Sequence, residues 1–255
     1  DDAAAEKMLA DAKCPCMTFS CGKPEADLEA TDLQLHADGV EFTAQYQGEK
    51  ADVKLPIPGH FSVENALTAL GIVLQLGMPL ADAAKSMATA TGVKGRVEVV
   101  PTDTDYTVLI DYAHSPDGVE NVLKAVRGFA KGRVVALFGC GGDRDASKRP
   151  IMGRAALAAD HAVVTSDNPR TEDPDAIIAD IVAGMGQGEG RFDVQPDRRA
   201  AIARAIQLAK PGDSVLVAGK GHEDYQLVGK EVLSFDDRVV AREELERAFG
   251  EGACE

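Results

Sequence analysis

The sequence lacks the features that would place the chain in a membrane, in a secretory pathway or on nucleic acid. No apolar run approaches the ~20 residues that a membrane-spanning helix needs, and the first residues carry no signal-peptide pattern. The 27 Lys and Arg residues are outnumbered by 42 Asp and Glu residues, which gives a formal net charge of −15. Such a charge argues against binding to nucleic acid through its phosphates. We therefore expect a cytoplasmic globular protein with neither a membrane nor a nucleic-acid partner.

Motifs of the common nucleotide and metal sites are also missing. The chain contains no G-x-x-x-x-G-K-[ST] phosphate loop. The glycine-rich stretch at Gly139 lacks the third glycine of a dinucleotide motif, and no acidic residue ~20 positions later obviously suits a ribose, so NAD is not expected. Cys14, Cys16 and Cys21 lie close together, but without a neighbouring His this spacing is unusual for zinc. We expect reduced thiols rather than a metal site.

Residues 1–94 combine short strands with helices. A helix is expected at 3–12 and a strand at 17–21. Strands are expected at 33–35, 40–46 and 51–55, with turns between them that indicate an antiparallel meander. The apolar stripe of residues 61–78 predicts a buried helix, and a second helix is expected at 80–91. Asn65, an amide in the first turns of the long helix, is either a ligand contact or a solvated polar position.

The pattern changes at Gly95-Arg96, where we place a domain boundary. From Val97 onward strands and helices alternate. Strands are expected at 107–111, 133–138, 161–165, 191–194 and 214–218, and helices at 116–130, 148–159, 174–185, 197–209 and 237–249. A hairpin is expected at 225–235. The alternation predicts an α/β, Rossmann-like domain over residues 95–255, with a mostly parallel sheet covered by helices on both faces.

Four polar loops follow strands of this second domain, at 111–117, 139–145, 166–170 and 219–224. The carboxyl ends of parallel strands meet at one edge of the sheet, which is where such folds bind ligands. The loops would therefore bring together around one crevice two arginines, two aspartates, Lys220, Glu223 and His114. Because each loop mixes glycine with charge, a joint binding site explains them better than four independent solvated turns.

The loop at 166–170 has the composition of a site for an amino acid. Pro169 restricts its own φ and drives Asn168 toward an extended conformation, so the loop should be stiff. Arg170 can bind a carboxylate with two parallel hydrogen bonds, and Asp167 can bind an ammonium. The alternative is a surface turn that caps the helix beginning near Asp175.

The four loops together resemble the Mur ligases, the ATP-dependent enzymes that form amide bonds in peptidoglycan precursors. The stretches DYAHSPD, GCGGDRDASKRP, SDNPRTEDP and VAGKGHEDYQ occur in the family's order, and the resemblance extends back through residues 59–70 to cover most of the chain. It is strongest to the branch that adds meso-diaminopimelate to UDP-MurNAc-L-Ala-D-Glu through an acyl phosphate. This branch uses ATP and Mg²⁺ and serves cell-wall biogenesis, and with it cell shape and cell division.

The resemblance assigns residues to two ligands. The distal end of meso-diaminopimelate is expected to contact Asp167, Asn168, Pro169, Arg170, Arg144, Gly219 and Glu223. The nucleotide is expected to contact Asn65 at its adenine, Arg96 and Asp111 near its ribose and phosphates, and His114 on its phosphate side. One departure is Ser62, where relatives often have Asn. The resemblance places no catalytic residue and no metal ligand in this chain.

The resemblance also predicts what these 255 residues leave out. A whole family member has an N-terminal UDP-binding domain, a phosphate loop, magnesium ligands and a carbamylated lysine. We therefore expect a fragment, with the second half of the central ATP-binding domain in residues 1–94 and a complete amino-acid-binding domain in 95–255, unable to turn over alone. Two alternatives stay open. One is a Mur ligase of another specificity or a folylpolyglutamate-synthase-like ligase, and the other is a non-catalytic amino-acid-binding module.

Overall fold

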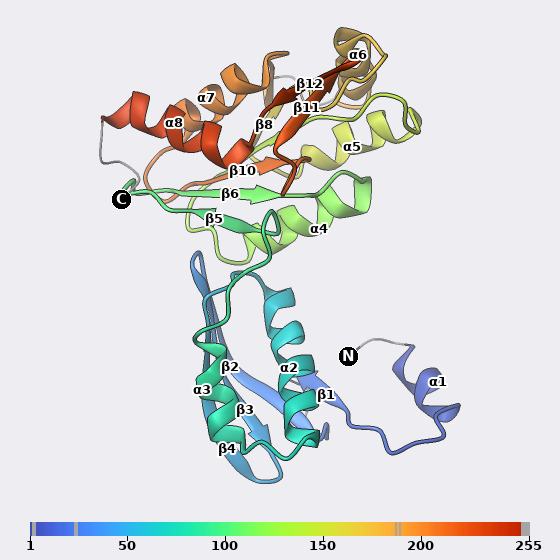
Figure 1. Ribbon diagram of the computed structural model, residues 1–255, viewed down its shortest axis with the longest axis vertical. Helices are drawn as coiled ribbons and strands as arrows, with labels where there is room; N and C mark the ends of the chain where they lie inside the picture. The colour runs from blue at the N-terminus through green and yellow to red at the C-terminus, as the bar shows by residue number, and fades with distance from the viewer. Residues whose placement is uncertain (2–3, 23–24, 187, 189, 251–255) are drawn as a thin grey trace. The chain divides into compact units, whose positions relative to one another are not determined.

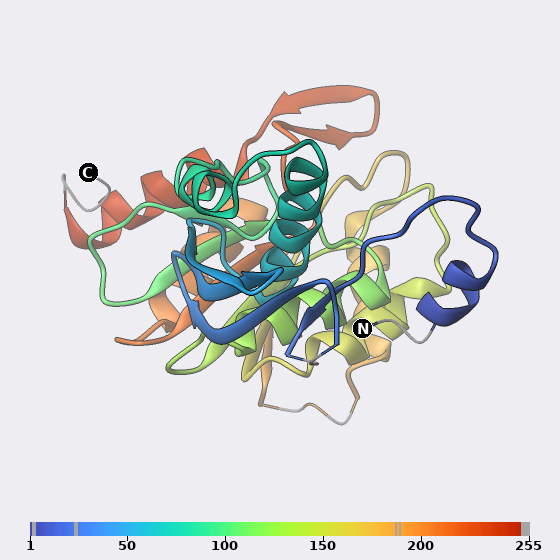
Figure 2. The ribbon, with the colours of Figure 1, turned by 90° about the horizontal axis from the view of Figure 1, so that it is seen from below.

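The computed structural model describes every residue except 2–3, 23–24, 187, 189 and 251–255 (Figures 1 and 2). The chain forms two compact units, Asp1–Gly92 and Val93–Glu255. Within the described part of the chain, no helix combines the length and the apolar character needed to cross a membrane.

The first unit is a four-stranded sheet with helices packed against it. Its strands lie in chain order, β1 (Phe19–Cys21), β2 (Leu28–His36), β3 (Gly39–Tyr46) and β4 (Glu49–Leu55). The antiparallel β2–β3–β4 meander was predicted, whereas β1 pairs with β2 in parallel. The helices are α1 (Ala5–Ala10), which buries none of its residues, α2 (His60–Gln75) and α3 (Leu80–Met87). Buried side chains of α2 and α3 share one core with the sheet.

Strand β2 begins five residues before the strand predicted at 33–35. Its first residues were missed because the alternation of buried and exposed side chains is interrupted within the strand. Leu28 and Ala30 are buried, as in a strand with one face on the core. The pairing with β3 then shifts register between Thr31 and Gln34, where Asp32 has a φ of 55°. This bulge breaks the two-residue periodicity, so the sequence pattern revealed only the part of the strand after it.

The second unit has a six-stranded sheet in the order β5–β6–β10–β7–β8–β9. The strands are β5 (Glu98–Val100), β6 (Thr107–Asp111), β7 (Val134–Phe138), β8 (His161–Val164), β9 (Phe192–Val194) and β10 (Ser214–Ala218). All neighbours are parallel except β5, which runs antiparallel to β6 and was not predicted. Every residue of β7 and β10 is buried, as expected for central strands covered on both faces.

Helices of the described residues cover this sheet, which confirms the predicted doubly wound α/β fold. They are α4 (Pro116–Arg127), α5 (Lys148–Ala156), α6 (Pro174–Ala183), α7 (Arg198–Leu208) and α8 (Asp237–Phe249). Helices α7 and α8 pack against each other and share one core with β6, β7, β8 and β10. Helices α4, α5 and α6 form a second layer, in which α5 contacts both of the others.

Side-chain caps fix where most of these helices begin. Helix α4 begins after Ser115, whose hydroxyl accepts a hydrogen bond from the Gly118 N–H, and its first residue is a proline. Asp173, Asp197 and Asp236 cap α6, α7 and α8 in the same way. A hairpin of β11 (Tyr225–Val228) and β12 (Glu231–Ser234) projects from the sheet, as Figures 1 and 2 show.

Candidate functional site

The parallel sheet brings the four polar loops to one edge, as predicted. Strand β10 pairs with β6 on one side and β7 on the other, and β7 pairs with β8. Their last residues are Asp111, Phe138, Val164 and Ala218. The chain therefore leaves all four strands at the same edge, and the Gly219 N–H donates to the Asp111 carbonyl across it.

Glycines let the loop after β7 lie directly on the loop after β8. A β-carbon at Gly139 would fall 2.5 Å from the Thr165 carbonyl oxygen, and one at Gly142 would fall 1.9 Å from the Pro169 carbonyl oxygen. The Gly142 N–H donates to the Asn168 carbonyl oxygen at 2.9 Å. These glycines therefore serve close backbone packing.

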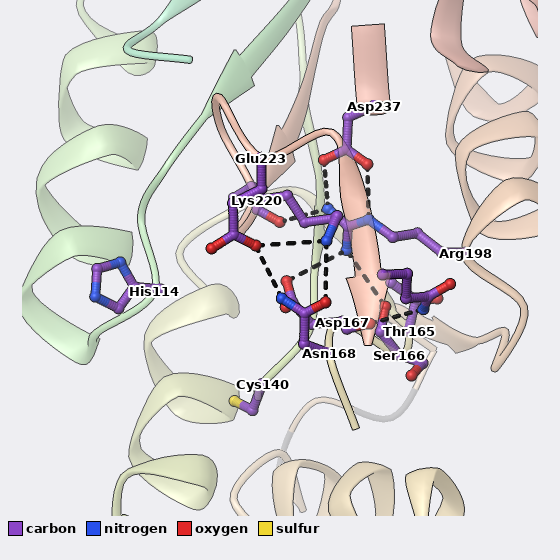
Figure 3. A network of polar contacts seen from close by, with 12 residues as sticks. His114, Cys140, Thr165, Ser166, Asp167, Asn168, Arg198, Lys220, Glu223 and Asp237 are labelled. Atoms are coloured by element: carbon purple, nitrogen blue, oxygen red, sulfur yellow. Dashed lines mark hydrogen bonds and ion pairs between the residues drawn. The ribbon is translucent and has the colours of Figure 1, made fainter. Parts of the chain in front are cut away.

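Asn168 joins three segments of the site. Its side-chain oxygen accepts hydrogen bonds from the Leu227 N–H at 2.9 Å and from Lys220 Nζ at 3.3 Å. Its amide nitrogen donates to Glu223 Oε2 at 2.8 Å (Figure 3). Both polar atoms of this 2% exposed residue are thus bonded within the protein. The amide fixes the orientation of the Glu223 carboxylate.

Lys220 is the buried cation of this network. Its side chain is fully buried, and its Nζ lies 3.5 Å from Glu223 Oε2 and 5.5 Å from the centre of the Tyr225 ring. A buried ammonium is tolerated only with such partners. Glu223, in contrast, keeps a partly exposed side chain. Asn168 and Lys220 therefore fix the Glu223 carboxylate from the protein side, while the carboxylate stays partly exposed to solvent.

Asp167 is a second carboxylate at this edge, and it is almost completely buried. Its Oδ2 lies 3.9 Å from Arg198 Nη1. Burial raises the pKa of Asp167 above its usual range, although the charges of Arg198 and Lys220 oppose that change. Within the described residues, the Asp167 carboxylate accepts no hydrogen bond. A buried carboxylate with one long ionic contact is well placed to bind a cationic ligand group.

Arg198 was missed by the sequence reasoning, although it is one of the largest fully buried side chains. It forms two hydrogen bonds with Asp237, Nε to Oδ1 at 2.8 Å and Nη2 to Oδ2 at 2.7 Å. One sequence signal points to its burial. Arg198 shares the stripe of Ala201, Ile202 and Ala205 on α7, and that stripe faces the core.

Arg170 and Arg144 bring positive charge to the loops after β8 and β7. A β-carbon at Gly141 would lie 2.8 Å from Arg170 Nη1 and 3.9 Å from Arg144 Cγ, so both side chains approach this glycine. Arg170 Nη1 donates to the Gly142 carbonyl at 2.8 Å, and its backbone pairs with the β11 strand. No salt bridge joins either guanidinium to a carboxylate of the described residues. Hydrogen bonds from Thr171 lower the pKa of the exposed Asp143 carboxyl, and the charges of Arg170 and Arg144 contribute to this.

The expected nucleotide residues of the second unit gather around Tyr112 rather than in the network of Asn168. The Arg96 guanidinium lies 5.0 Å from the Tyr112 ring centre, and the rings of His114 and His222 lie 4.6 and 4.9 Å from it. In Figure 3, no dashed line joins His114 to the other residues drawn. The residues predicted to surround one crevice therefore form two groups. One contains the carboxylates and guanidiniums near Asn168, and the other surrounds the Tyr112 ring.

The Asp111 carboxylate holds two backbone segments together. Its Oδ2 accepts from the Val97 N–H at 2.8 Å and its Oδ1 from the Ala113 N–H at 2.7 Å. Burial raises its pKa, while these two hydrogen bonds and the charge of Arg96 oppose the change. Asn65 lies on the exposed side of α2 in the other unit, so its nucleotide contact stays a prediction.

The donor set offers little to a magnesium ion. Across the described ranges of the chain, no three His, Cys, Asp or Glu side chains are grouped as metal ligands would be. Asp111 commits both oxygens to backbone N–H groups. We therefore assign the metal of a Mur ligase no ligand among these residues and derive no step through it.

Comparison with known proteins connects this geometry to a family. Residues 1–73 match the model of the Mur ligase middle domain, and residues 95–221 match the model "Mur ligase, glutamate ligase domain". A UDP-N-acetylmuramoyl-L-alanyl-D-glutamate–2,6-diaminopimelate ligase of Syntrophomonas wolfei is 47% identical over 245 residues, 95% of this chain and 50% of the relative. The enzyme of the same name from Parasynechococcus marenigrum is 49% identical over 236 residues, 90% of this chain and 47% of the relative.

Solved structures agree. A structure of a UDP-N-acetylmuramoyl-L-alanyl-D-glutamate–2,6-diaminopimelate ligase superposes with a TM-score of 0.76 at 38% identity, over 97% of this chain and 52% of that one. A UDP-N-acetylmuramate–alanine ligase of Thermotoga maritima has a TM-score of 0.62 at 19% identity, over 91% of this chain and 47% of that one, and shows the shared fold alone. The chain spans about half the length of each relative. On these grounds the chain belongs to the Mur ligase family.

Proposed function

We propose that the chain is part of an ATP-dependent ligase that joins meso-diaminopimelate to the D-glutamate carboxylate of UDP-MurNAc-L-Ala-D-Glu through an acyl phosphate, in cytoplasmic peptidoglycan precursor synthesis. Unit Val93–Glu255 would bind the incoming amino acid. The names of the relatives that are 47% and 49% identical support the reaction. The observation that carries the proposal is the convergence at one sheet edge of two carboxylates, those of Asp167 and Glu223, with the guanidiniums of Arg144 and Arg170.

The chemistry of the ligand fits this pairing. The distal end of meso-diaminopimelate carries a carboxylate and an ammonium, whereas lysine ends in an ammonium alone. Arg170 would bind the distal carboxylate with two hydrogen bonds, assisted by the charge of Arg144. Asp167 and Glu223 would face the ammonium. Lysine would leave Arg170 without its anion, so the site would discriminate against it.

The residues of this chain would contribute by positioning the attacking amine rather than by covalent chemistry. An amino acid held at its distal end on a stiff loop has few remaining orientations, which lowers the entropic part of the barrier. On the nucleotide side, Arg96, Asp111 and His114 would lie near ATP, with Asp111 acting through the backbone that it holds. The adenine contact of Asn65 stays a prediction.

Calorimetric titration of this chain with meso-diaminopimelate and with L-lysine tests the proposal. We expect meso-diaminopimelate to bind about 10²-fold more tightly, because two hydrogen bonds to a charged group contribute ~3 kcal/mol in total. Arg170→Lys keeps the charge but loses the two-pronged geometry, and should weaken meso-diaminopimelate at least ~10-fold while changing lysine little. Arg127→Ala, on α4, is the control and should change neither.

Two results would contradict the proposal. One is equal affinity for the two amino acids, which would point to a ligase of different specificity. The other is absence of binding by a chain whose circular dichroism shows an intact fold, which would mean that unit Val93–Glu255 does not form the amino-acid site by itself.

Turnover by these residues alone is not expected. None of the 255 residues belongs to a G-x-x-x-x-G-K-[ST] phosphate loop, which in such enzymes holds the phosphates of ATP. A phosphate-release assay with ATP, Mg²⁺, UDP-MurNAc-L-Ala-D-Glu and meso-diaminopimelate should give the rate of the enzyme-free blank. Release that depends on all four additions would overturn this expectation.

A further inference from the structure

Arg198 lies where two helices and two strand ends of the sheet edge meet. It is the first residue of α7, and its side chain is fully buried. Its Nη2 donates to the carbonyl of Ala218, the last residue of β10, at 3.0 Å. Its Nη1 approaches the carbonyl of Ser166, after β8, at 3.4 Å. In Figure 3 the guanidinium lies between Asp237 of α8 and the loop of Asp167.

Asp237 fixes this guanidinium. The two hydrogen bonds between them, at 2.7 and 2.8 Å, have the two-pronged geometry of the strongest Arg–carboxylate pairs. Both side chains are fully buried. The charge of Asp237 and its hydrogen bonds hold the pKa of Arg198 above its ordinary value, although burial opposes this. With Nε and Nη2 committed, Nη1 is the nitrogen that faces Ser166 and Asp167.

The charges around Asp167 are not balanced. Its neighbours are Arg198 from α7, Asp237 from α8, and Lys220 and Glu223 from the loop after β10. The Cys140 thiol, after β7, is also close enough for the charge of Asp167 to raise its pKa. Three carboxylates thus share two buried cations. With all five groups ionised, this leaves an excess of one negative charge, which suits a ligand ammonium. How much of that charge resides on Asp167 depends on its contact with Arg198.

We propose that Arg198 is a positioning residue of the amino-acid site: Asp237 holds its guanidinium, and the guanidinium sets the position and the ionisation of the Asp167 carboxylate that faces the ligand ammonium. The identity of the ligand rests on the proposed function. The connection between Arg198 and Asp167 stands on the distances alone. Helices α7 and α8, which carry no residue of the predicted site, would thereby control amino-acid affinity.

Two substitutions separate this role from a purely structural brace, because they act on Asp167 in opposite directions. The double variant Arg198→Met/Asp237→Leu removes the buried pair together, a change that proteins often tolerate without unfolding. It removes both the cation and a carboxylate, and because Arg198 has the larger effect on Asp167, the pKa of Asp167 should rise. The single variant Asp237→Asn removes the competing carboxylate and leaves the cation, so the pKa of Asp167 should fall. A general loosening of the fold would move both variants in the same direction.

The experiment is a carbon-detected NMR titration of the Asp167 carboxyl, assigned with Asp167→Asn, together with calorimetric titration of meso-diaminopimelate at pH 7.5. We expect the double variant to bind at least ~10-fold more weakly and Asp237→Asn to bind as tightly as the unmodified chain or more so. Arg198→Lys keeps the charge without the two-pronged geometry. Its Asp167 pKa should lie close to that of the unmodified chain, while its affinity for meso-diaminopimelate should be only partly retained.

Arg133→Met is the matched control at the other end of the same elements. The Arg133 guanidinium donates to the carbonyl of Leu208, the last residue of α7, at 2.7 Å, and to Asp213, just before β10, at 2.7 Å. Its loss should leave the titration of Asp167 and the affinity unchanged.

An Asp167 titration that is unchanged in the double variant, or that moves the same way in both variants, would overturn the proposal, as would an equal effect of Arg133→Met. If the unmodified chain binds no meso-diaminopimelate, the proposed function fails. The NMR titration, which needs no ligand, still shows whether Arg198 governs Asp167.

Discussion

Gly219 lies directly against the carboxylate of Asp167. A β-carbon at Gly219 would fall 2.7 Å from Asp167 Oδ2, closer than real side chains approach. The φ of Gly219 is +117°, a conformation that residues with a side chain rarely adopt. Glycine is therefore required here both for the backbone and for the space beside Asp167.

Gly219→Ala is expected to lower both stability and affinity. Backbone strain at this φ costs about 1–3 kcal/mol of unfolding free energy, and the new methyl group must displace the Asp167 carboxylate. Urea denaturation measures the first effect and calorimetric titration of meso-diaminopimelate the second. Gly212→Ala is the control, because Gly212 has a φ of +86° and its β-carbon would meet nothing closer than 4.0 Å. It should lose stability but keep its affinity, and equal affinity losses in the two variants would contradict the role of Asp167.

Asn168→Asp should destabilise the chain in a pH-dependent way. The substitution places a carboxylate oxygen where the amide nitrogen now donates to Glu223 Oε2 at 2.8 Å. At pH 8 the lost hydrogen bond and the new repulsion should cost about 1–3 kcal/mol. Near pH 4 a protonated Asp can donate again, so the loss should shrink. Asn121→Asp, on the exposed face of α4, should cost less than ~0.5 kcal/mol at both pH values.

A pH-independent loss in Asn168→Asp would count against this account. It would mean that the amide matters for its shape, or for the bond that its oxygen accepts from the Leu227 N–H, and not as the donor that orients Glu223.

The arrangement of the second unit was readable from the sequence because its signals are local. Strands β6 and β10 were predicted with their observed bounds, since each is a short apolar run between turn residues. The convergence of the four loops followed from the geometry of parallel strands. Strand β5 was not predicted because it is only three residues long and lies antiparallel at the edge of the sheet.

The connections within the site were not readable, because they join residues far apart in the chain. Asn168 bonds to Lys220, Glu223 and Leu227, which are 52, 55 and 59 positions away. No local pattern states which donor meets which acceptor across such separations. Arg198 illustrates the same limit, since helical periodicity places it on the buried face of α7 but does not name Asp237 as its partner.

Asp167→Asn should stabilise the chain at neutral pH. Burial raises the pKa of Asp167 in the folded state above its unfolded value, so its contribution to stability is fully present below the unfolded pKa and is lost as the pH rises through the folded pKa. An amide does not ionise and avoids that loss. Thermal unfolding should therefore show a higher Tm for the variant at pH 8, a difference that disappears by about pH 4, while binding of meso-diaminopimelate weakens.

Asp213→Asn is the comparison variant, in which the change in stability at pH 8 should have the opposite sign. Although burial acts to raise it, hydrogen bonds from Arg133 and from the Lys210 N–H lower the pKa of Asp213. Its stabilising effect is present above the unfolded pKa and is lost as the pH falls through the folded pKa. This variant should be less stable than the unmodified chain at pH 8. If Asp167→Asn behaved in the same way, Asp167 would be a stabilising structural residue and not a carboxylate held at a cost for a ligand.

Cys140 should be chemically inert although it lies at the site. Burial, with a smaller effect from the charge of Asp167, raises the pKa of its thiol to about 12, and its sulfur lies 3.6 Å from Met152 Sδ. Because the thiolate is the reactive form, a pKa this high makes alkylation at pH 8 ~10³-fold slower than for an ordinary cysteine, before access is considered. Mass spectrometry after iodoacetamide treatment should find the exposed Cys14 and Cys16 labelled first, and Cys140 labelled only once denaturant is added. Labelling of Cys140 as fast as Cys14 in the native chain would show that the loop after β7 opens to solvent. It would then contradict the close packing of this loop on the Asp167 loop.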